Sequence, residues 1–406
     1  MKTLFIFNHK DGNFRDEVIE CFAPLYTDNI APMAVEEALT SWVIDVDELR
    51  GYYRLARSNF IGEVLQSVQG NNKHREYPAV LEMMRAKMEL GGTIMLRDSE
   101  LTARQRNRFF NEAAHYGYQV YVITGGLGSL PLGDQETDEF PTYAHSLRFD
   151  EIEDVLTVNP VNGKDFGRLV AIGDIHGYID QLEEVFAKFG HPKDTQGTLF
   201  IFCGDYVDGG PETGKVLEVL EEIIDLPNVR VIIGNHDFNL FGVASSMVSK
   251  EIVKETWKTW SKLKDQGWDA KRYRKLYRKM IPGVQVNDVP GAKESCVFFS
   301  HAGVSYPTAR AVSLFCDAEF FYGASTTQDV INGKSSWSGL DWQQVRNESL
   351  LPCVQVFGHR NAFVGDDFEQ IVTSPDEETT LVNVESGVKK PNGWLSCALF
   401  DGDDIE

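Results

Sequence analysis

Gly173-Asp174-Ile175-His176-Gly177 follows directly on the apolar run Leu169-Val170-Ala171-Ile172. A short, uninterrupted apolar run of this kind predicts a buried β-strand. The Asp-x-His-Gly stretch then places a carboxylate and an imidazole at the carboxyl end of that strand. In open α/β sheets, this end is where ligands bind. The stretch therefore predicts a strand that leads directly into a functional site.

The same arrangement recurs further along the chain, where other apolar runs end in Asp, Asn or His. These runs and the polar stretches after them are Phe200-Ile201-Phe202-Cys203 before Gly204-Asp205-Tyr206-Val207-Asp208, Val231-Ile232-Ile233 before Gly234-Asn235-His236-Asp237, Val297-Phe298-Phe299-Ser300 before His301, and Val354-Gln355-Val356-Phe357 before Gly358-His359. So many strand ends of this composition are hard to obtain by chance. We expect their polar side chains to converge on one site.

The series resembles the calcineurin-like metallophosphoesterases, in particular the phosphoprotein-phosphatase branch with its GDxHG, GDxVDRG and GNHD/E blocks. The resemblance covers about residues 168–402. Several blocks occur in the family's order, which is more specific than one short pattern. The resemblance implies a β-sandwich flanked by helices and a phosphoesterase activity.

The resemblance also implies a pair of divalent metal ions held by six side chains. The implied ligands are Asp174 and His176 for the first metal, Asp205 as the bridge, and Asn235, His301 and His359 for the second. This mixture of carboxylate, imidazole and amide ligands suits manganese, with iron, zinc or nickel as alternatives, better than calcium or magnesium. Metals in such sites lie about 3.5–4 Å apart and clamp the attacking and leaving oxygens.

Two further residues have implied roles in the reaction itself. A metal-bound hydroxide attacks phosphorus in line, and His236 protonates the leaving alkoxide while Asp208 orients it. The chemistry requires such a pair, because an imidazole held by a carboxylate supplies a proton near neutral pH. Asp237 stands where many relatives have glutamate, and we expect it to be structural.

The chain departs from the family pattern at the substrate side. Relatives carry an arginine after GDxVD, and here Gly209-Gly210-Pro211 follows. A second arginine is expected near a tryptophan, but Ser338 follows Trp337. A planar guanidinium is the usual partner of a terminal phosphate. Arg360 is a candidate substitute, and a diester or cyclic phosphate, with one negative charge fewer, would also suit the loss.

Residues 250–279 form a basic, aromatic insert in a chain of net charge −22. Lysines recur at every fourth position near its start, which predicts one face of a helix. Basic and aromatic residues beside a phosphoesterase site could follow a nucleic-acid backbone and stack a base. The candidate nucleic-acid contacts are Lys254, Lys258, Arg272 and Arg274. The alternative is a helical lid with solvated lysines and packed tryptophans.

Residues 1–128 resemble a P-loop kinase domain of the polynucleotide-kinase type. Alternating strands and helices predict a parallel sheet. The stretch 93–123 carries most of the resemblance, and residues 42–50, with Asp45 and Asp47, resemble the family's second strand and its Asp-x-x-Arg. No glycine-rich phosphate loop follows the first strand, and without it the β- and γ-phosphates of ATP have no cradle. We therefore expect a degenerate domain without kinase activity.

Length and composition limit the number of domains, the class of protein and its compartment. A chain of 406 residues with 42% apolar and 25% charged residues predicts a two-domain soluble α/β protein. We expect the kinase-like domain at 1–128, a boundary segment at 129–166 and the phosphoesterase at 167–406. Unpaired cysteines indicate a reducing cytoplasm. The apolar run at 4–7 is too short for a signal peptide or a membrane span.

The expected activity is hydrolysis of phosphoesters of nucleic-acid ends or nucleotides. The fusion resembles bacterial and phage polynucleotide kinase–phosphatases, which supports this substrate class. The alternatives are a protein Ser/Thr phosphatase, a dinucleoside-polyphosphate hydrolase, and a non-catalytic scaffold that binds nucleic acid or protein. The sequence leaves the physiological substrate and the oligomeric state open.

Overall fold

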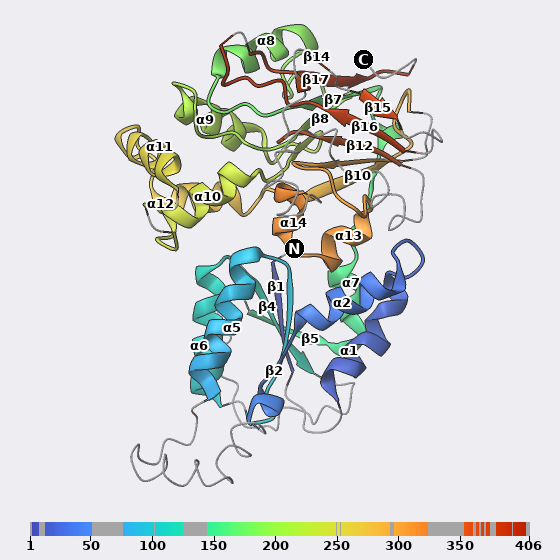
Figure 1. Cartoon of the computed structure of the whole chain (residues 1–406), viewed down its shortest axis with the longest axis vertical. Helices are drawn as coiled ribbons and strands as arrows, with labels where there is room; N and C mark the ends of the chain where they lie inside the picture. The colour runs from blue at the N-terminus through green and yellow to red at the C-terminus, as the bar shows by residue number, and fades with distance from the viewer. Residues whose placement is uncertain are drawn as a thin grey trace. The chain divides into compact units, whose positions relative to one another are not determined.

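The computed structural model contains two compact units, residues 1–158 with 313–317, and residues 159–312 with 318–406 (Figure 1). The residues that the structure describes are 2–7, 13–50, 76–100, 102–124, 144–248, 250–251, 253–292, 296–323, 353–359, 363–364, 367–368, 371–373, 379–391 and 393–402. Arg360 and Trp337 lie outside them.

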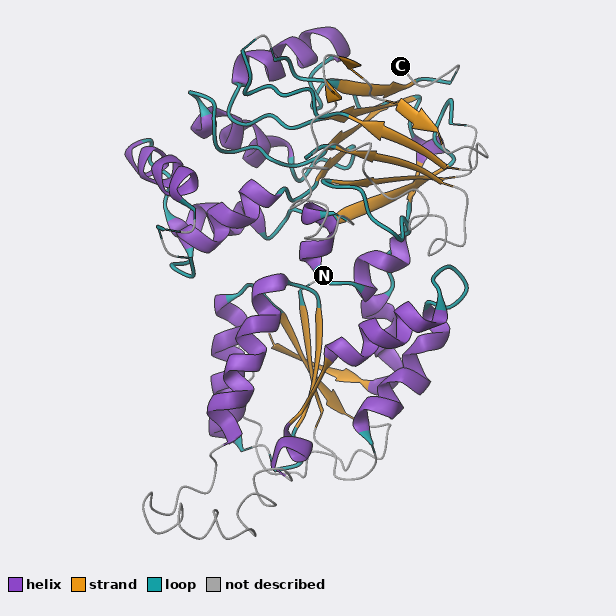
Figure 2. Cartoon of the chain, in the orientation of Figure 1, coloured by secondary structure: helices purple, strands orange, loops and turns teal. Residues whose placement is uncertain are grey.

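The N-terminal unit is a parallel sheet with helices on both faces (Figure 2). Its strands, in spatial order, are β2 (Val43–Asp45), β3 (Thr93–Arg97), β1 (Thr3–Phe7), β4 (Gln119–Thr124) and β5 (Ala144–Arg148). Its helices are α1 (Phe14–Phe22), η1 (Ala23–Leu25), α2 (Pro32–Trp42), α5 (Glu76–Leu90), α6 (Ala103–His115), η2 (Phe149–Glu151) and α7 (Ile152–Leu156). The central strand β1 is buried along its whole length, as a parallel strand covered on both faces requires.

The N-terminal unit extends beyond the boundary expected at residue 128. Strand β5 pairs in parallel with β4, with Ala144 opposite Val120, so part of the segment 129–166 belongs to this sheet. Only Ala144 of the strand is buried. Because β5 is an edge strand with mostly exposed side chains, it lacks the apolar run by which buried strands are predicted.

The C-terminal unit packs two sheets face to face. One sheet has the order β15 (Ile371–Thr373), β16 (Thr379–Asn383), β12 (Cys353–Phe357), β11 (Cys296–Ser300), β10 (Gly283–Asn287) and β6 (Val161–Asn162). The other has the order β17 (Cys397–Phe400), β7 (Arg168–Ile172), β8 (Thr198–Phe202) and β9 (Val229–Val231). A separate hairpin joins β13 (Phe363–Val364) and β14 (Asp367–Phe368).

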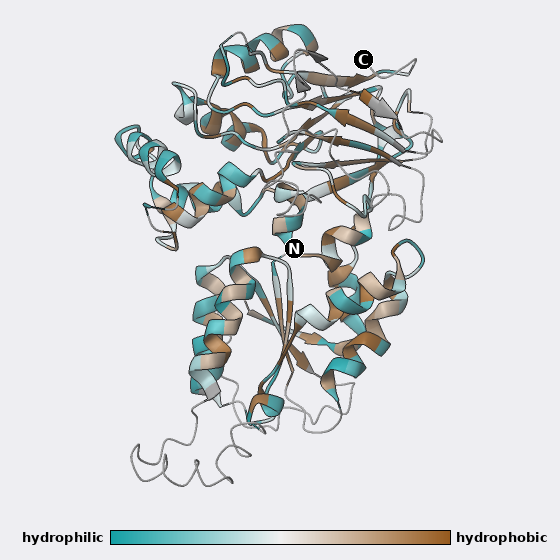
Figure 3. Cartoon of the chain, in the orientation of Figure 1, coloured by the Kyte–Doolittle hydropathy of each residue, from teal (hydrophilic) through white to brown (hydrophobic). Residues whose placement is uncertain are grey.

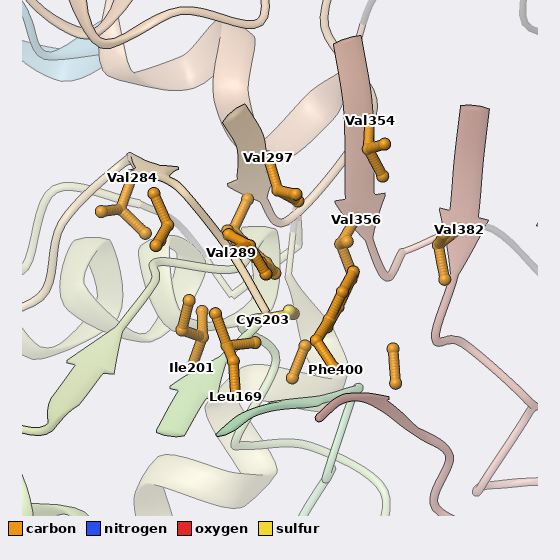
Figure 4. Close-up of a cluster of buried hydrophobic side chains, with 14 of the residues drawn as sticks. Leu169, Ile201, Cys203, Val284, Val289, Val297, Val354, Val356, Val382 and Phe400 are labelled. Carbon is orange, nitrogen blue, oxygen red and sulfur yellow. The ribbon is translucent and has the colours of Figure 1, made fainter. Parts of the chain in front are cut away.

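Buried side chains from both sheets form one apolar core (Figure 4). Leu169 and Ile201 of the smaller sheet meet Val297 and Val356 of the larger one within it. Burial of this apolar surface holds the two sheets together. The strand ends that carry polar residues are thereby fixed on a rigid frame.

Helices flank the sandwich and form the insert. They are η3 (Gly163–Asp165), α8 (Ile179–Phe189), α9 (Thr213–Ile223), α10 (Asn235–Ala244), α11 (Lys254–Asp265), α12 (Ala270–Tyr277), α13 (Ala309–Leu314) and α14 (Asp317–Tyr322). In Figure 3, α11 is largely hydrophilic, whereas the strands of the sandwich are largely hydrophobic. In the part of the chain that the structure describes, no helix is long and apolar enough to cross a bilayer.

Four of the five aromatic residues of the insert are buried, and Trp257 is partly buried. Trp260, Trp268, Tyr273 and Tyr277 are all buried, and the Tyr277 ring stacks on Phe241 of α10 at 4.4 Å. Buried rings cannot stack on the bases of a bound strand. For these side chains, the structure therefore favours the packed lid over the base-stacking platform.

Candidate metal centre

The six side chains proposed as ligands follow five different strands. Asp174 and His176 follow β7, Asp205 follows β8, Asn235 opens α10 after β9, His301 follows β11 and His359 follows β12. All of these positions are carboxyl ends of strands, and the structure brings the six residues together there. Strand order in space, rather than nearness in sequence, assembles the site.

Asp205 lies at the centre of the cluster. Its Oδ2 is 3.6 Å from His176 Nε2, and its Oδ1 is 3.4 Å from His301 Nε2. The other ring nitrogens are 2.9 Å from the carbonyl oxygen of Val207 and 2.7 Å from that of Cys203. A carbonyl accepts only, so Nδ1 of each ring donates there, and a neutral ring then turns an Nε2 lone pair toward the carboxylate.

The protonation state of His176 supports a cation between its ring and Asp205. Burial lowers the pKa of His176 to about 4, so its ring is neutral at pH 7. A neutral Nε2 lone pair and a carboxylate oxygen repel each other unless a cation lies between them. Carboxylate oxygen and imidazole nitrogen are ligands of manganese, iron and zinc. The donor atoms at this point therefore fit a divalent metal.

A second group of donors shares Asp205. The amide oxygen of Asn235 lies 3.1 Å from His301 Nε2 and 3.0 Å from His359 Nδ1. Two sets of side chains hold donor atoms close enough for one ion each: His176, Asp205 and His236, and Asp205, His301 and His359. Asp205 belongs to both sets, which is the geometry that a bridging ligand requires. The first set includes His236, for which we expected only a role in proton transfer.

Asp174 adds a second buried carboxylate. The backbone N–H of His359 donates to its two oxygens at 3.2 and 3.0 Å. Burial, and then the nearby charges of Glu385 and Asp205, raise the pKa of Asp174 well above its ordinary range. Among the described residues, no lysine or arginine forms an ion pair with Asp174 or Asp205. Two bound cations would supply the missing positive charge.

His236 and Asp208 form a separate pair beside these donors. His236 Nδ1 lies 2.8 Å from Asp208 Oδ2, and Thr256 of α11 donates its hydroxyl to the same oxygen at 2.7 Å. Burial disfavours the charged imidazole of His236, but Asp205 and Asp208 outweigh it and raise its pKa. A protonated, oriented imidazole can donate a proton to a leaving oxygen.

Backbone strain marks the same residues. His176, Asp205, Asp208 and His359 all have positive φ, at 48°, 54°, 66° and 62°. Residues other than glycine adopt this region at a cost of about 1–3 kcal/mol each, and such strain clusters at functional sites. The surrounding hydrogen bonds hold these side chains where unstrained backbone would not place them.

Asp237 ties two of the strand ends together. Its buried carboxylate accepts the backbone N–H groups of Gly234 and Asp205 at 2.9 Å and of Tyr206 at 3.1 Å. Burial and the charge of Asp205 raise its pKa to about 7. These contacts are those of a structural residue, as we expected for this position.

The basic residues of the insert divide into two groups. Arg272 donates to Glu221 at 3.0 and 2.7 Å and lies over the Trp268 ring, and Arg274 donates to the carbonyl of Ala270. Lys254 and Lys258, by contrast, are exposed. With Lys262, they line a cavity of about 390 Å³ whose other wall includes Gly209, Gly210 and Pro211.

Sequence patterns did not reveal three residues around the centre. Thr256 lies in the basic run, where spacing indicates a helix but not which side chain meets Asp208. Glu385 follows β16 and adjoins Asp174, more than 200 residues earlier in the chain. Lys389 packs against Gly209, far from it in sequence. No local motif signals such contacts.

Sequence comparisons find known proteins that are similar to part of this chain. A symmetrical bis(5'-nucleosyl)-tetraphosphatase of Hamiltonella defensa subsp. Acyrthosiphon pisum is 34% identical over 76 residues, 19% of this chain and 26% of that protein. The enzyme of the same name from Neisseria meningitidis serogroup A is 42% identical over 74 residues, 18% and 25% of the two chains. This chain thus spans about a quarter of the length of these relatives.

Among solved structures, a cold-active protein-tyrosine phosphatase of a psychrophilic Shewanella is similar, with a TM-score of 0.38 and 16% identity over 62% of this chain and 80% of that one. The family model described as calcineurin-like phosphoesterase matches residues 167–370, which include the strand ends described above. The chain belongs to the calcineurin-like phosphoesterase family.

Proposed function

We propose that the protein is a dinuclear metal-dependent phosphoesterase that hydrolyses phosphoesters of nucleotides or nucleic-acid ends. The observation that carries this proposal is the pair of donor sets that share Asp205. Two bound divalent cations would activate a water and polarise the phosphoryl group. Manganese fits the carboxylate, imidazole and amide donors best, with iron, zinc or nickel as alternatives.

The side chains of this protein divide the remaining work. Asp174, His176, Asn235, His301 and His359 would hold the cations around Asp205. His236, oriented by Asp208 and Thr256, donates a proton to the leaving oxygen. The leaving group then departs as a neutral alcohol rather than as an alkoxide, which lowers the barrier.

The cavity beside Gly209 supports a polyanionic substrate. Lys254, Lys258 and Lys262 lie one helical turn apart on α11 and line the same cavity. Among the described residues, no carboxylate forms an ion pair with any of these three lysines. Exposed ammonium groups on one helix face attract phosphate chains. This arrangement suits further phosphates of a nucleotide or a nucleic-acid backbone, without base stacking by the buried aromatic rings.

Other substrates fit the same reaction. A dinucleoside polyphosphate is also polyanionic, and tetraphosphatases of this kind are relatives of this chain. A protein Ser/Thr phosphatase would need a groove for a peptide, and the described residues contain no observation that favours one. A scaffold without activity would not need the strained backbone and the shared Asp205.

We also propose that the N-terminal unit is a kinase-like domain without ATP chemistry. Asp45 accepts from Arg97 Nε at 3.1 Å, so this carboxylate is already paired. Binding of a fluorescent ATP analogue to the N-terminal half in the full chain would overturn this proposal.

A substrate panel tests the main proposal. Manganese-loaded protein is assayed on p-nitrophenyl phosphate, its bis ester, end-phosphorylated oligonucleotides, a phosphopeptide and diadenosine tetraphosphate. We expect cleavage of nucleotide or oligonucleotide esters and none of the phosphopeptide. Exclusive cleavage of the phosphopeptide, or of no compound, would contradict the proposal.

A further inference from the structure

The turn between β16 and β17 reaches the metal centre from the far end of the chain. Gly387 accepts the N–H of Lys390 at 2.7 Å, and Lys390 in turn accepts the N–H of Gly393 at 2.9 Å. The following residues are tied to the end of β7, since Gly173 donates to the carbonyl of Ser396 at 3.0 Å. The turn is thus held in place at the strand end that carries Asp174.

Lys389 leaves this turn and lies against Gly209. Gly209 has φ of +107°, and a Cβ built on it would lie 2.5 Å from Cδ and 2.9 Å from Cγ of Lys389. The same Cβ would lie 3.8 Å from the Cβ of His176. The alkyl chain of Lys389 therefore occupies the space that a side chain at position 209 would need, directly beside the donor cluster.

The ammonium group of Lys389 is available to an anion. Lys389 is exposed, and no ion pair joins it to a carboxylate anywhere in the described parts of the chain. The Lys389 side chain and His176 both lie beside Gly209, so the charge of Lys389 lies next to the donor cluster.

We propose that Lys389 is a substrate-binding residue that receives the non-bridging oxygens of the phosphoryl group at the metal centre. The glycine after Asp208 makes room for this side chain, so the positive charge comes from the turn at 387–393. The inference rests on the proposed phosphoesterase function. A lysine is a point charge on a flexible stem, whereas arginine offers a planar pair of donors. Because Lys389 offers charge rather than a planar pair of donors, we expect it to favour a phosphate monoester over the less charged diester.

Charge removal at this position tests the inference. Lys389→Met removes the ammonium and keeps most of the stem, Lys389→Gln removes it with a polar end, and Lys389→Arg keeps the charge. Lys390→Met, on the same turn, is the matched control. Inorganic phosphate is titrated calorimetrically into the metal-loaded full chain, and steady-state kinetics are measured on p-nitrophenyl phosphate and its bis ester.

We expect Lys389→Met and Lys389→Gln to weaken phosphate binding about tenfold or more and to raise KM for the monoester by a similar factor. The effect on the bis ester should be smaller, because it carries less charge. Lys389→Arg and Lys390→Met should stay within about twofold of the unmodified protein. Unchanged phosphate affinity in both charge-removing variants of an active protein overturns the inference. A protein that neither binds phosphate nor cleaves any nucleotide, oligonucleotide or p-nitrophenyl ester refutes the proposed function instead.

Discussion

Both units of the chain gather buried carboxylates at the ends of parallel strands, but they neutralise them differently. In the N-terminal unit, Arg97 pairs with Asp45, and Arg50 Nη2 lies 2.8 Å from Asp98 Oδ1. In the C-terminal unit, Asp174 and Asp205 face imidazoles and an amide, with no arginine or lysine paired to them among the described residues. In the N-terminal unit, arginine side chains neutralise the carboxylates. In the C-terminal unit, the carboxylates are surrounded by donor atoms that suit metal ions.

The strand ends of the two units show how similar positions acquire different roles. A buried carboxylate needs a positive partner, because desolvation alone costs several kcal/mol. Where the chain places a guanidinium beside it, the charge is satisfied and the edge is structural. Where the chain places neutral donor groups instead, the edge retains affinity for divalent metals.

The largest effect is expected from Asp205→Asn. The neutral amide would weaken both donor sets at once, so hydrolysis of the best substrate should fall by more than about a hundredfold. Asp194→Asn, an exposed aspartate of the same unit, is the matched control and should retain full activity. The measurement is kcat/KM in excess manganese. Equal kcat/KM values for the two variants would show that Asp205 does not act at the metal centre.

Stability should respond in opposite directions at the two edges. Asp98→Asn weakens one of the ion pairs of the buried Arg50, which keeps Asp47 as a partner, and should lower the free energy of unfolding by about 1–3 kcal/mol. In metal-free protein, Asp174→Asn removes one of two buried like charges and should raise that free energy by about 1 kcal/mol or more. Urea denaturation without metal measures both. A loss of stability in Asp174→Asn would show that the contrast between the edges is false.

A middle-sized effect is expected from Thr256→Val, which keeps the shape but removes the hydroxyl that donates to Asp208. Poorer orientation of His236 should lower kcat about tenfold for an ester with a basic leaving group. An ester whose leaving group needs no proton should be cleaved at nearly the normal rate. Thr256→Ser keeps the hydroxyl, so its kcat on both esters should stay close to that of the unmodified protein. Equal loss on both esters would assign Thr256 a purely structural role.

The smallest effect is expected from the lysines of α11. Lys254→Met with Lys258→Met should raise KM for a polyanionic substrate about three- to fivefold and leave p-nitrophenyl phosphate unchanged. The effect should shrink in high salt, which screens exposed charges. The same increase on the small ester would mean that the cavity does not select polyanions.

Particular residues show which parts of the fold and of the metal centre could be predicted from the sequence. The five strand ends were predicted because each combines a buried run with a polar stretch, and local patterns are enough for both. Strand β5 escaped prediction because its exposed side chains leave no apolar signal. The contact of Lys389 with Gly209 escaped because it depends on the fold rather than on spacing. Helical spacing likewise placed Lys254 and Trp260 in one helix without telling which side faces the core.

The metal content of the purified full chain tests whether the protein binds two metal ions that share Asp205. After loading with manganese and removal of the excess, elemental analysis should find two ions per chain in the unmodified protein. Asp205→Asn should lose both ions, because Asp205 belongs to both donor sets, and Asp194→Asn should keep them. An unmodified protein that retains no transition metal, or an Asp205→Asn variant that retains two ions, would contradict the account.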